Sequence, residues 1–267
     1  MFDLSNCRFA FLDVETTGLS PWFGDRVCEV GIVLTEGKRI KTTYQQLVNP
    51  ERPLSPAAAS TNRLSDSELR RAPIFAEIAA NVESLLREAV VVCHNAQFDL
   101  QFLDSEFRRL GHEIEIPNLI DTLSLARQAI ACPSYSLVSL AEAFGVQKVE
   151  AHRALADALT DRAVFFALME KTLPGGKSVG DFIGIYNSPA WSNDNIQLPV
   201  ELAEAVASGK RLLITYVDKK GAQTQRWVDP LQVVGLADYI YLRGYCHLRE
   251  SERSFRLDRI VEVRVEV

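Results

Sequence analysis

A stretch rich in glycine, serine, asparagine and proline, "PGGKSVGDFIGIYNSPAWSNDN" at 174–195, divides the chain into two parts. It has no sustained hydrophobic period, which is typical of a linker. The part before it alternates strand-like and helix-like segments, whereas the part after it is mostly strand-like. We therefore expect two domains with different folds, at 1–173 and 196–267.

The first part has the segment order of a layered α/β domain. A strand within 7–18 ends in a turn at Gly18, and a hairpin in 26–50 turns at "TEGK". The run "AVVVCHN" at 89–95 is short, apolar and β-branched, as expected of a buried strand. Helices are predicted in 65–89, 96–111, 120–130, 136–145 and 152–173. This pattern predicts a mixed sheet with flanking helices.

The second part is predicted to be a small β-rich module. One helix is expected in 199–209, and strands are expected in 211–234, 239–248, 253–260 and 261–267. About seventy residues lie within the size range of domains that fold alone.

The bulk properties favour a protein with a sizeable core in a reducing compartment. Hydrophobic residues make up 47% of the chain, and its five scattered cysteines form no C-x-x-C pair. The early Asp3, with no basic segment before it, argues against a signal peptide. No apolar run approaches the ~20 residues that cross a bilayer. We expect a cytoplasmic protein that does not enter a membrane.

The net charge of −6 argues against binding of nucleic acid unless cations intervene. Residues 195–267 hold 11 Lys and Arg against 10 Asp and Glu, so the remaining residues carry a net charge of −7. An acidic domain still binds a polyanion when its carboxylates hold cations, because the ions then set the local field.

Four carboxylates stand where strands end or helices begin. Asp13 and Glu15 leave the first strand on the same face, where their charges repel unless a cation lies between them. Asp99 and Asp157 lie early on predicted helices. Taken alone, the first pair also fits two surface acids, and the other two fit acids favoured by a helix dipole. His152 precedes its helix on a loop, so it need not share the helical face of Asp157.

Three segments, "DVETTGL" at 13–19, "HNAQFDLQFL" at 94–103 and "HRALADA" at 152–158, resemble the motifs of the DEDDh family of 3′→5′ exonucleases. This family includes the proofreading epsilon subunit of bacterial DNA polymerase III and RNase T. The resemblance covers roughly residues 7–172 and implies a ribonuclease H-like fold with two divalent metal ions, Mg²⁺ or Mn²⁺. It implies that the metal ligands are Asp13, Glu15, Asp99 and Asp157, and that the general base is His152.

The same motifs indicate where the terminal nucleotide binds. Thr16, Gly18 and Leu19 follow the first acids on a turn, where a backbone amide and an apolar side chain can hold it. These residues also fit a simple exit from strand to turn. Asn95 and Phe98 belong to the second motif and are predicted to contact the substrate.

Two positions distinguish this chain from other patterns of the wider family. Arg153 lies four residues before Asp157, where the sister subclass has a tyrosine, so the histidine version fits better. Asn62 and Arg63 stand where family members often carry His-Gly. The second difference leaves the metal ligands intact and leaves open how this segment contacts substrate.

Residues 197–267 resemble the WYL domain, a small Sm- or SH3-like β-barrel. "YLRGYCHLR" and "FRLDRI" carry the match, whereas Ile240 replaces the name-giving tryptophan. The resemblance implies that a basic and aromatic pocket binds nucleic acid or a nucleotide-like ligand. The matching candidates are Tyr216, Arg226, Tyr241, Arg249, Arg253, Arg256 and Arg259. The tyrosines also fit core positions of a small barrel, and Arg256 and Arg259 also fit ion pairs with Asp258 and Glu262.

The sequence therefore predicts a metal-dependent 3′→5′ exonuclease that releases nucleoside 5′-monophosphates from single-stranded DNA or DNA 3′ ends. The alternatives are an RNA-directed exonuclease and a regulatory nucleic-acid binder without turnover. The intact set of four acids and a histidine argues against the non-catalytic binder. The expected partner is nucleic acid, with DNA favoured over RNA. A nucleotide ligand at the C-terminal module and a protein partner such as a polymerase are further candidates that the sequence leaves open.

Overall fold

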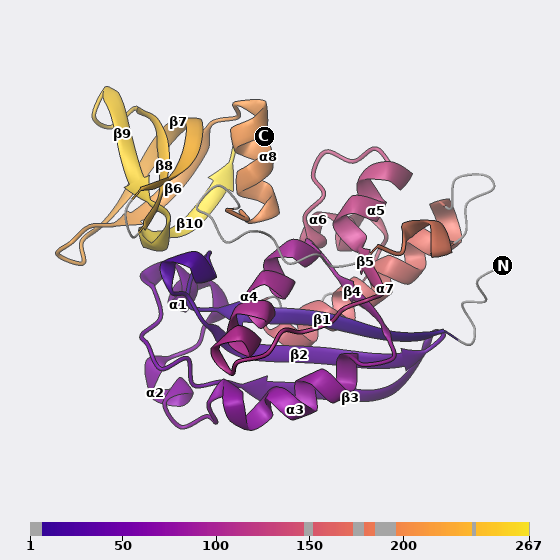
Figure 1. Ribbon diagram of the computed structural model, residues 1–267. Coiled ribbons are helices and arrows are strands. Elements are labelled where there is room, and N and C mark those ends of the chain that lie inside the picture. Colours follow the sequence, from indigo (N-terminus) through magenta and orange to yellow (C-terminus); the bar gives the residue numbers. More distant parts are fainter. Residues whose placement is uncertain (1–6, 147–151, 173–178, 185–195, 237–238, 267) are drawn as a thin grey trace. The chain divides into compact units, whose positions relative to one another are not determined.

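A computed structural model describes residues 7–146, 152–172, 179–184, 196–236 and 239–266 (Figure 1). The chain divides into two compact units. The first contains Met1–Glu15, Val27–Glu51 and Leu69–Ser188, and the second contains Thr16–Arg26, Arg52–Glu68 and Pro189–Val267. The domain boundaries expected from the sequence stay a prediction, and most of the expected linker, 174–178 and 185–195, lies outside the described residues. No helix of the described ranges is both long and apolar enough to cross a membrane.

The first sheet has the strand order β3-β2-β1-β4-β5. β1 (Arg8–Thr16) runs parallel to β4 (Val90–Cys93), which runs parallel to β5 (Leu119–Asp121). β2 (Val27–Glu36) and β3 (Arg39–Leu47) form the expected hairpin. This mixed sheet and its flanking helices confirm the predicted ribonuclease H-like fold class.

Helices of the first unit cover both faces of this sheet. Their bounds are α3 (Phe75–Leu86), α4 (Ala96–Arg109), α5 (Thr122–Ala129), α6 (Leu137–Ala143), α7 (Ala154–Thr172) and η3 (Val179–Phe182). The second unit contains η2 (Pro21–Phe23), α1 (Pro56–Asn62) and most of α2 (Asp66–Leu69). α1 and η2 were not predicted. Both are short and begin at a proline, which suits the first position of a helix.

Alternate side chains of β1 point to opposite faces of the sheet. Leu12 packs in the cluster that contains α3 and α4. Phe9 and Phe11 pack in the cluster that contains α5, α6 and α7. Asp13 and Glu15 continue the series of Phe9 and Phe11, so the period of the strand directs both carboxylates to the α7 face.

Aromatic packing and one glycine hold α7 against this face. The ring centroid of Phe165 lies 5.3 Å from that of Phe9 and 5.6 Å from that of Phe11. A Cβ atom added to Gly31 of β2 would lie 2.2 Å from the carbonyl carbon of Ala154. Only glycine therefore lets β2 approach the first turn of α7 this closely.

The second sheet is antiparallel and has the order β10-β6-β7-β8-β9. Its elements are α8 (Val200–Ser208), β6 (Leu212–Val217), β7 (Gln223–Leu236), β8 (Tyr239–Cys246), β9 (Ser251–Arg256), η4 (Leu257–Arg259) and β10 (Ile260–Val265). The predicted β-rich module is confirmed, but its described strands form an open sheet and not a closed barrel. The reason is that η4 carries the chain away from β9, so β10 pairs with β6 and leaves β9 as the other edge.

Candidate active site

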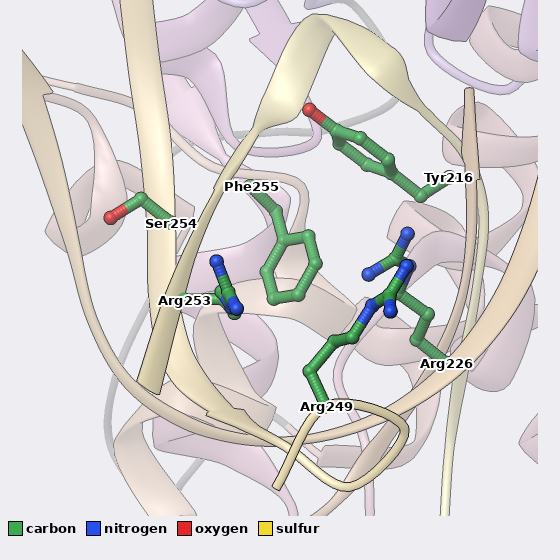
Figure 2. A pocket seen from close by; sticks show the side chains of 6 residues that line it. All are labelled: Tyr216, Arg226, Arg249, Arg253, Ser254 and Phe255. Carbon is green, nitrogen blue, oxygen red and sulfur yellow. The ribbon is translucent and has the colours of Figure 1, made fainter. Parts of the chain in front are cut away.

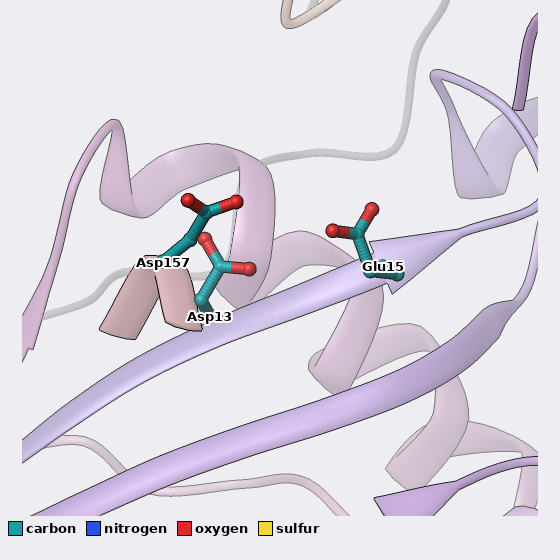
Figure 3. A group of neighbouring side chains, drawn as sticks. All are labelled: Asp13, Glu15 and Asp157. Carbon is teal, nitrogen blue, oxygen red and sulfur yellow. The ribbon is translucent and has the colours of Figure 1, made fainter. Parts of the chain in front are cut away.

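β1 and α7 bring three of the predicted metal ligands together. Asp13 and Glu15 leave β1 on one face, and Asp157 in the first turn of α7 lies beside them (Figure 3). One oxygen of each carboxylate lies within 4.8 Å of the other two. This donor set consists of carboxylate oxygens alone, which hard divalent cations such as Mg²⁺ and Mn²⁺ prefer.

Burial and mutual repulsion hinder the ionisation of these carboxyls. The pKa of Asp13 is raised well above its ordinary value, first by burial and then by the charges of Asp99 and Asp157. Burial, followed by the charges of Asp157 and Glu29, raises the pKa of Glu15. A bound cation relieves this repulsion, so the residues present fit the divalent metal that the family implies.

Asp99 lies outside that group of three and holds the end of β1. The parallel pairing of β1 with β4 reaches Phe11, which is opposite Val92. Beyond it, the N–H of Val14 donates to Oδ1 of Asp99 at 2.9 Å, so the carboxylate takes the place of a strand partner. Asp99 thereby fixes the stretch of β1 that carries Asp13.

His152 lies on the loop before α7, with a left-handed φ of 63°. Its N–H donates to Oδ2 of Asp157 at 2.9 Å. The histidine and the last acid are therefore joined through the backbone, which needs no shared helical face. The His152 side chain is exposed and lies outside the group of three carboxylates.

An ion pair between Arg153 and a buried acid, which the sequence did not predict, anchors this loop to the sheet. Glu29 of β2 is fully buried and accepts from Arg153 Nη2 at 2.8 Å and from Arg153 Nε at 3.1 Å. The N–H of Ala154 donates to the same carboxylate at 3.2 Å. The only signal in the sequence is an acid within the apolar strand "VCEVGIV".

Asp161 is a further carboxyl that sequence reasoning missed. It lies one turn beyond Asp157 on α7 and is 2% exposed. Burial raises its pKa to about 7, so near neutral pH it adds less than a full negative charge to the site. Its spacing of four residues from Asp157 in "DALTD" is the signal that was available.

The first group of predicted substrate contacts forms a structured turn. Thr16 Oγ1 donates to the carbonyl oxygen of Gly18 at 2.6 Å. A Cβ atom on Gly18 would lie 2.3 Å from Oδ2 of Asp25, so a larger residue there would displace the Asp25 carboxylate. Leu19 is half-buried and packs against the hydrophobic cluster of the second unit. The role of these residues in substrate binding stays a prediction.

The second group lies at the start of α4. Asn95 has a left-handed φ of 69°, and its N–H donates to Oδ1 of Asp121 at 3.1 Å. Phe98 packs on the core with its ring centroid 5.1 Å from that of Phe102. Their contact with substrate also stays a prediction.

The two residues at the family's His-Gly position have clear local roles. Asn62 is buried, and its Nδ2 donates to the carbonyl oxygen of Thr16 at 3.1 Å. Arg63 follows with a left-handed φ of 54°, a conformation that favours glycine. Asn62 therefore supports the turn that follows Glu15.

A cavity of about 310 Å³ lies in the second unit (Figure 2). Four of the seven residues predicted from the WYL resemblance line it, together with Ser254 and Phe255, which were not predicted. The four are Tyr216, Arg226, Arg249 and Arg253. Arg256 instead pairs with Asp258 at 3.0 Å, and its guanidinium lies 3.2 Å from the ring centroid of Tyr239. Tyr241 and Arg259 are not part of the lining.

A mixed sheet with two acids on its central strand and a third on an adjacent helix defines a site that can hold a divalent metal ion. The chain belongs to the exonuclease family, because the family described as Exonuclease matches residues 10–165. The family described as WYL domain matches residues 199–265.

The relatives in sequence are longer proteins. The DNA polymerase III PolC-type of Caldanaerobacter subterraneus subsp. tengcongensis is 35% identical over 176 residues, which are 65% of this chain and 12% of that protein. The 3′-5′ exonuclease DinG of Staphylococcus haemolyticus is 31% identical over 171 residues, 63% of this chain and 19% of that protein. The chain thus spans a small part of these relatives.

Solved structures share the fold. E. coli exonuclease I in complex with a dT13 oligonucleotide has a TM-score of 0.57 and 19% identity, covering 90% of this chain and 55% of that one. Exonuclease X in complex with 5′ overhanging duplex DNA has a TM-score of 0.51 and 24% identity, covering 66% of this chain and 96% of that one.

Proposed function

We propose that this protein is a metal-dependent 3′→5′ exonuclease that releases nucleoside 5′-monophosphates from DNA. The observation that carries the proposal is the convergence of Asp13, Glu15 and Asp157 within 4.8 Å in a chain of the exonuclease family. Two structural relatives hold a dT13 oligonucleotide and a duplex DNA with a 5′ overhang, which supports DNA as the substrate.

The residues have distinct tasks in phosphodiester hydrolysis. Asp13, Glu15, Asp99 and Asp157 would hold two Mg²⁺ or Mn²⁺ ions, which when bound stabilise charge on the phosphate oxygens and lower the pKa of water. His152, on the exposed loop beside Asp157, accepts the proton of the attacking water as general base. Cleavage of the bond between phosphorus and O3′ leaves a 3′-hydroxyl on the strand and a 5′-phosphate on the released nucleotide.

The C-terminal module is proposed to bind nucleic acid or a nucleotide-like ligand in its cavity. Three arginines and two aromatic rings line the space, and these are the groups that bind phosphates and stack on bases.

The decisive assay uses the full chain with 5′-labelled single-stranded DNA, duplex DNA and RNA of one sequence, in Mg²⁺, Mn²⁺ or EDTA. We expect DNA products that shorten progressively from the 3′ end, slower degradation from a 3′-phosphate, and no degradation in EDTA. Faster degradation of RNA would favour an exoribonuclease. Internal nicks as first products would exclude an exonuclease.

Two variants test the metal site in the same assay. Asp157→Asn should abolish degradation, because it removes a ligand of the ions that stabilise transition-state charge. Glu83→Gln is the matched control, since this acid pairs with Arg87 on the surface of α3. Turnover near that of the wild type in Asp157→Asn would exclude the assignment.

A further inference from the structure

The cavity of the second unit is built from the neighbouring strands β6 and β7 and from β9, which β8 separates from β7. Tyr216 comes from β6, Arg226 from β7 and Phe255 from β9, and the remaining lining residues lie on β9 or on the turn before it. The rings of Tyr216 and Phe255 meet edge to face, with centroids 5.4 Å apart, because the sheet curves. The curved face thereby encloses a hollow that Figure 2 shows with its six side chains.

The three arginines of this cavity differ from other arginines of the same sheet. Four of those pair with acids: Arg211 with Asp229, Arg243 with Glu252, Arg256 with Asp258 and Arg264 with Glu262. Within the described ranges, no acid forms an ion pair with any arginine of the cavity. Three guanidinium groups that repel one another around one hollow favour an anionic ligand.

Arg226 is held in place without an ion pair to an acid. Its Nε donates to Oγ1 of Thr224 at 3.1 Å, and its guanidinium lies 5.8 Å from the ring centroids of both Tyr216 and Phe255. A guanidinium that is oriented by rings and one hydroxyl keeps its other N–H groups for a ligand. Arg249 and Arg253 are exposed and place two further guanidinium groups at the rim of the cavity.

We infer that this cavity binds a single nucleotide through a terminal 5′-phosphate. A phosphomonoester carries about −1.5 to −2 charges at pH 7 and three acceptor oxygens, whereas an internal phosphodiester carries about −1. Three unpaired guanidiniums therefore fit the monoester better. A volume of about 310 Å³ is at the lower end of small-molecule sites, which suits one nucleotide whose base lies against Tyr216.

The choice of a 5′-phosphate, and not a 3′-phosphate, rests on the proposed function, because 3′→5′ hydrolysis releases nucleoside 5′-monophosphates. The module then detects the product of the catalytic unit. A 5′-phosphate is also present at the 5′-phosphorylated end of a short strand. Binding of a free nucleotide and of such a strand end must therefore be compared.

The test is calorimetric binding to the full chain in EDTA, which stops turnover. The probes are adenosine 5′-monophosphate, adenosine, inorganic phosphate, and a DNA tetranucleotide with either a 5′-phosphate or a 5′-hydroxyl. We expect the monophosphate to bind at least about tenfold more tightly than adenosine or inorganic phosphate, since each lacks half of the contacts. Tighter binding of the 5′-phosphorylated tetranucleotide would identify a strand end as the source. Equal binding of both tetranucleotides, or of adenosine and its monophosphate, would overturn the inference.

Variants locate the binding. Arg226→Gln with Arg253→Gln should weaken binding of the monophosphate by more than about tenfold, and Arg253→Lys should weaken it less because the charge stays. Arg264→Gln is the control, since this exposed arginine pairs with Glu262. Unchanged binding by the double variant, with an unchanged melting temperature, would overturn the inference. A wild type that binds the monophosphate but degrades no strand would overturn the proposed function alone.

Discussion

The imidazole of His152 projects from a backbone that Asp157 already holds through a hydrogen bond to the N–H of His152. Removing the ring leaves this bond in place, so His152→Ala removes the proposed general base and keeps the hydrogen bond that orders the loop. We expect it to lose on the order of 10²-fold or more in turnover, the usual range for a general base. The acidic limb of its pH–rate profile should change as well, and its melting temperature should not. Single-turnover rates across pH measure both effects.

His112 provides the control for this variant, because it is exposed and lies outside the group of three carboxylates. His112→Ala should keep the rate and pH profile of the wild type. Wild-type activity in His152→Ala would mean that another group accepts the proton.

His94, just after β4, is a half-buried histidine whose ring is neutral near pH 7. Burial, together with the charge of Arg127, lowers its pKa to about 4. Its Nε2 lies 3.0 Å from the carbonyl oxygen of Tyr135, and a carbonyl only accepts, so Nε2 carries the proton of the neutral ring. In the unfolded chain the His94 ring takes up a second proton below about pH 6.5, whereas in the folded chain it does so only near pH 4. Between these two pH values the unfolded state therefore binds more protons. Stability is therefore lost as pH falls through this window.

His94→Gln keeps an N–H donor and cannot become charged, so it should remove this loss. Between pH 7 and 4 the wild type should lose on the order of 3 kcal/mol more free energy of unfolding than the variant. Urea unfolding of both proteins in EDTA at a series of pH values measures the difference. Parallel curves would show that His94 does not contribute to the pH dependence of folding.

At the scale of elements, the position of α7 relative to β2 decides whether Asp157 reaches Asp13. A Cβ atom on Gly31 would lie 2.2 Å from the carbonyl carbon of Ala154, and backbone atoms cannot swing aside as a side chain can. We expect Gly31→Ala to cost about 1–3 kcal/mol of stability. It should also lower turnover by about tenfold or more, because small displacements of reacting groups are costly.

Thermal unfolding and the turnover number measure these effects. Gly184→Ala is the control, since the nearest atom to its added Cβ, the carbonyl oxygen of Leu119, lies 3.9 Å away. If Gly31→Ala behaved as this control does, the approach of β2 to α7 would not be what places Asp157.

The sequence predicts the faces of these elements better than the contacts between them. The period of two on β1 predicted that Asp13 and Glu15 share a face, and the structure brings them within 4.8 Å of each other and of Asp157. The pair of Glu29 and Arg153, in contrast, joins residues 124 positions apart, and no local pattern encodes such a contact. The open sheet of the second unit was missed for a related reason, since strand patterns do not specify which edges pair.

At the scale of the whole molecule, two sites of opposite charge lie in different units. The three carboxylates of the candidate active site attract cations, and the three arginines of the cavity attract anions. A ligand that binds only the folded state stabilises it by RT ln(1 + [L]/Kd), which is about 2.7 kcal/mol at a hundredfold excess over Kd. Each ligand should therefore stabilise its own unit.

We expect two thermal transitions in calorimetry of the full chain, with Mn²⁺ raising one and adenosine 5′-monophosphate in EDTA raising the other. Asp157→Asn should abolish only the response to Mn²⁺, because it removes a carboxylate ligand. Arg226→Gln with Arg253→Gln should abolish only the response to the nucleotide. A single transition raised by both ligands would mean that the units unfold as one cooperative body. A nucleotide that raised only the transition sensitive to Mn²⁺ would bind at the carboxylates, and the assignment of the cavity would then be wrong.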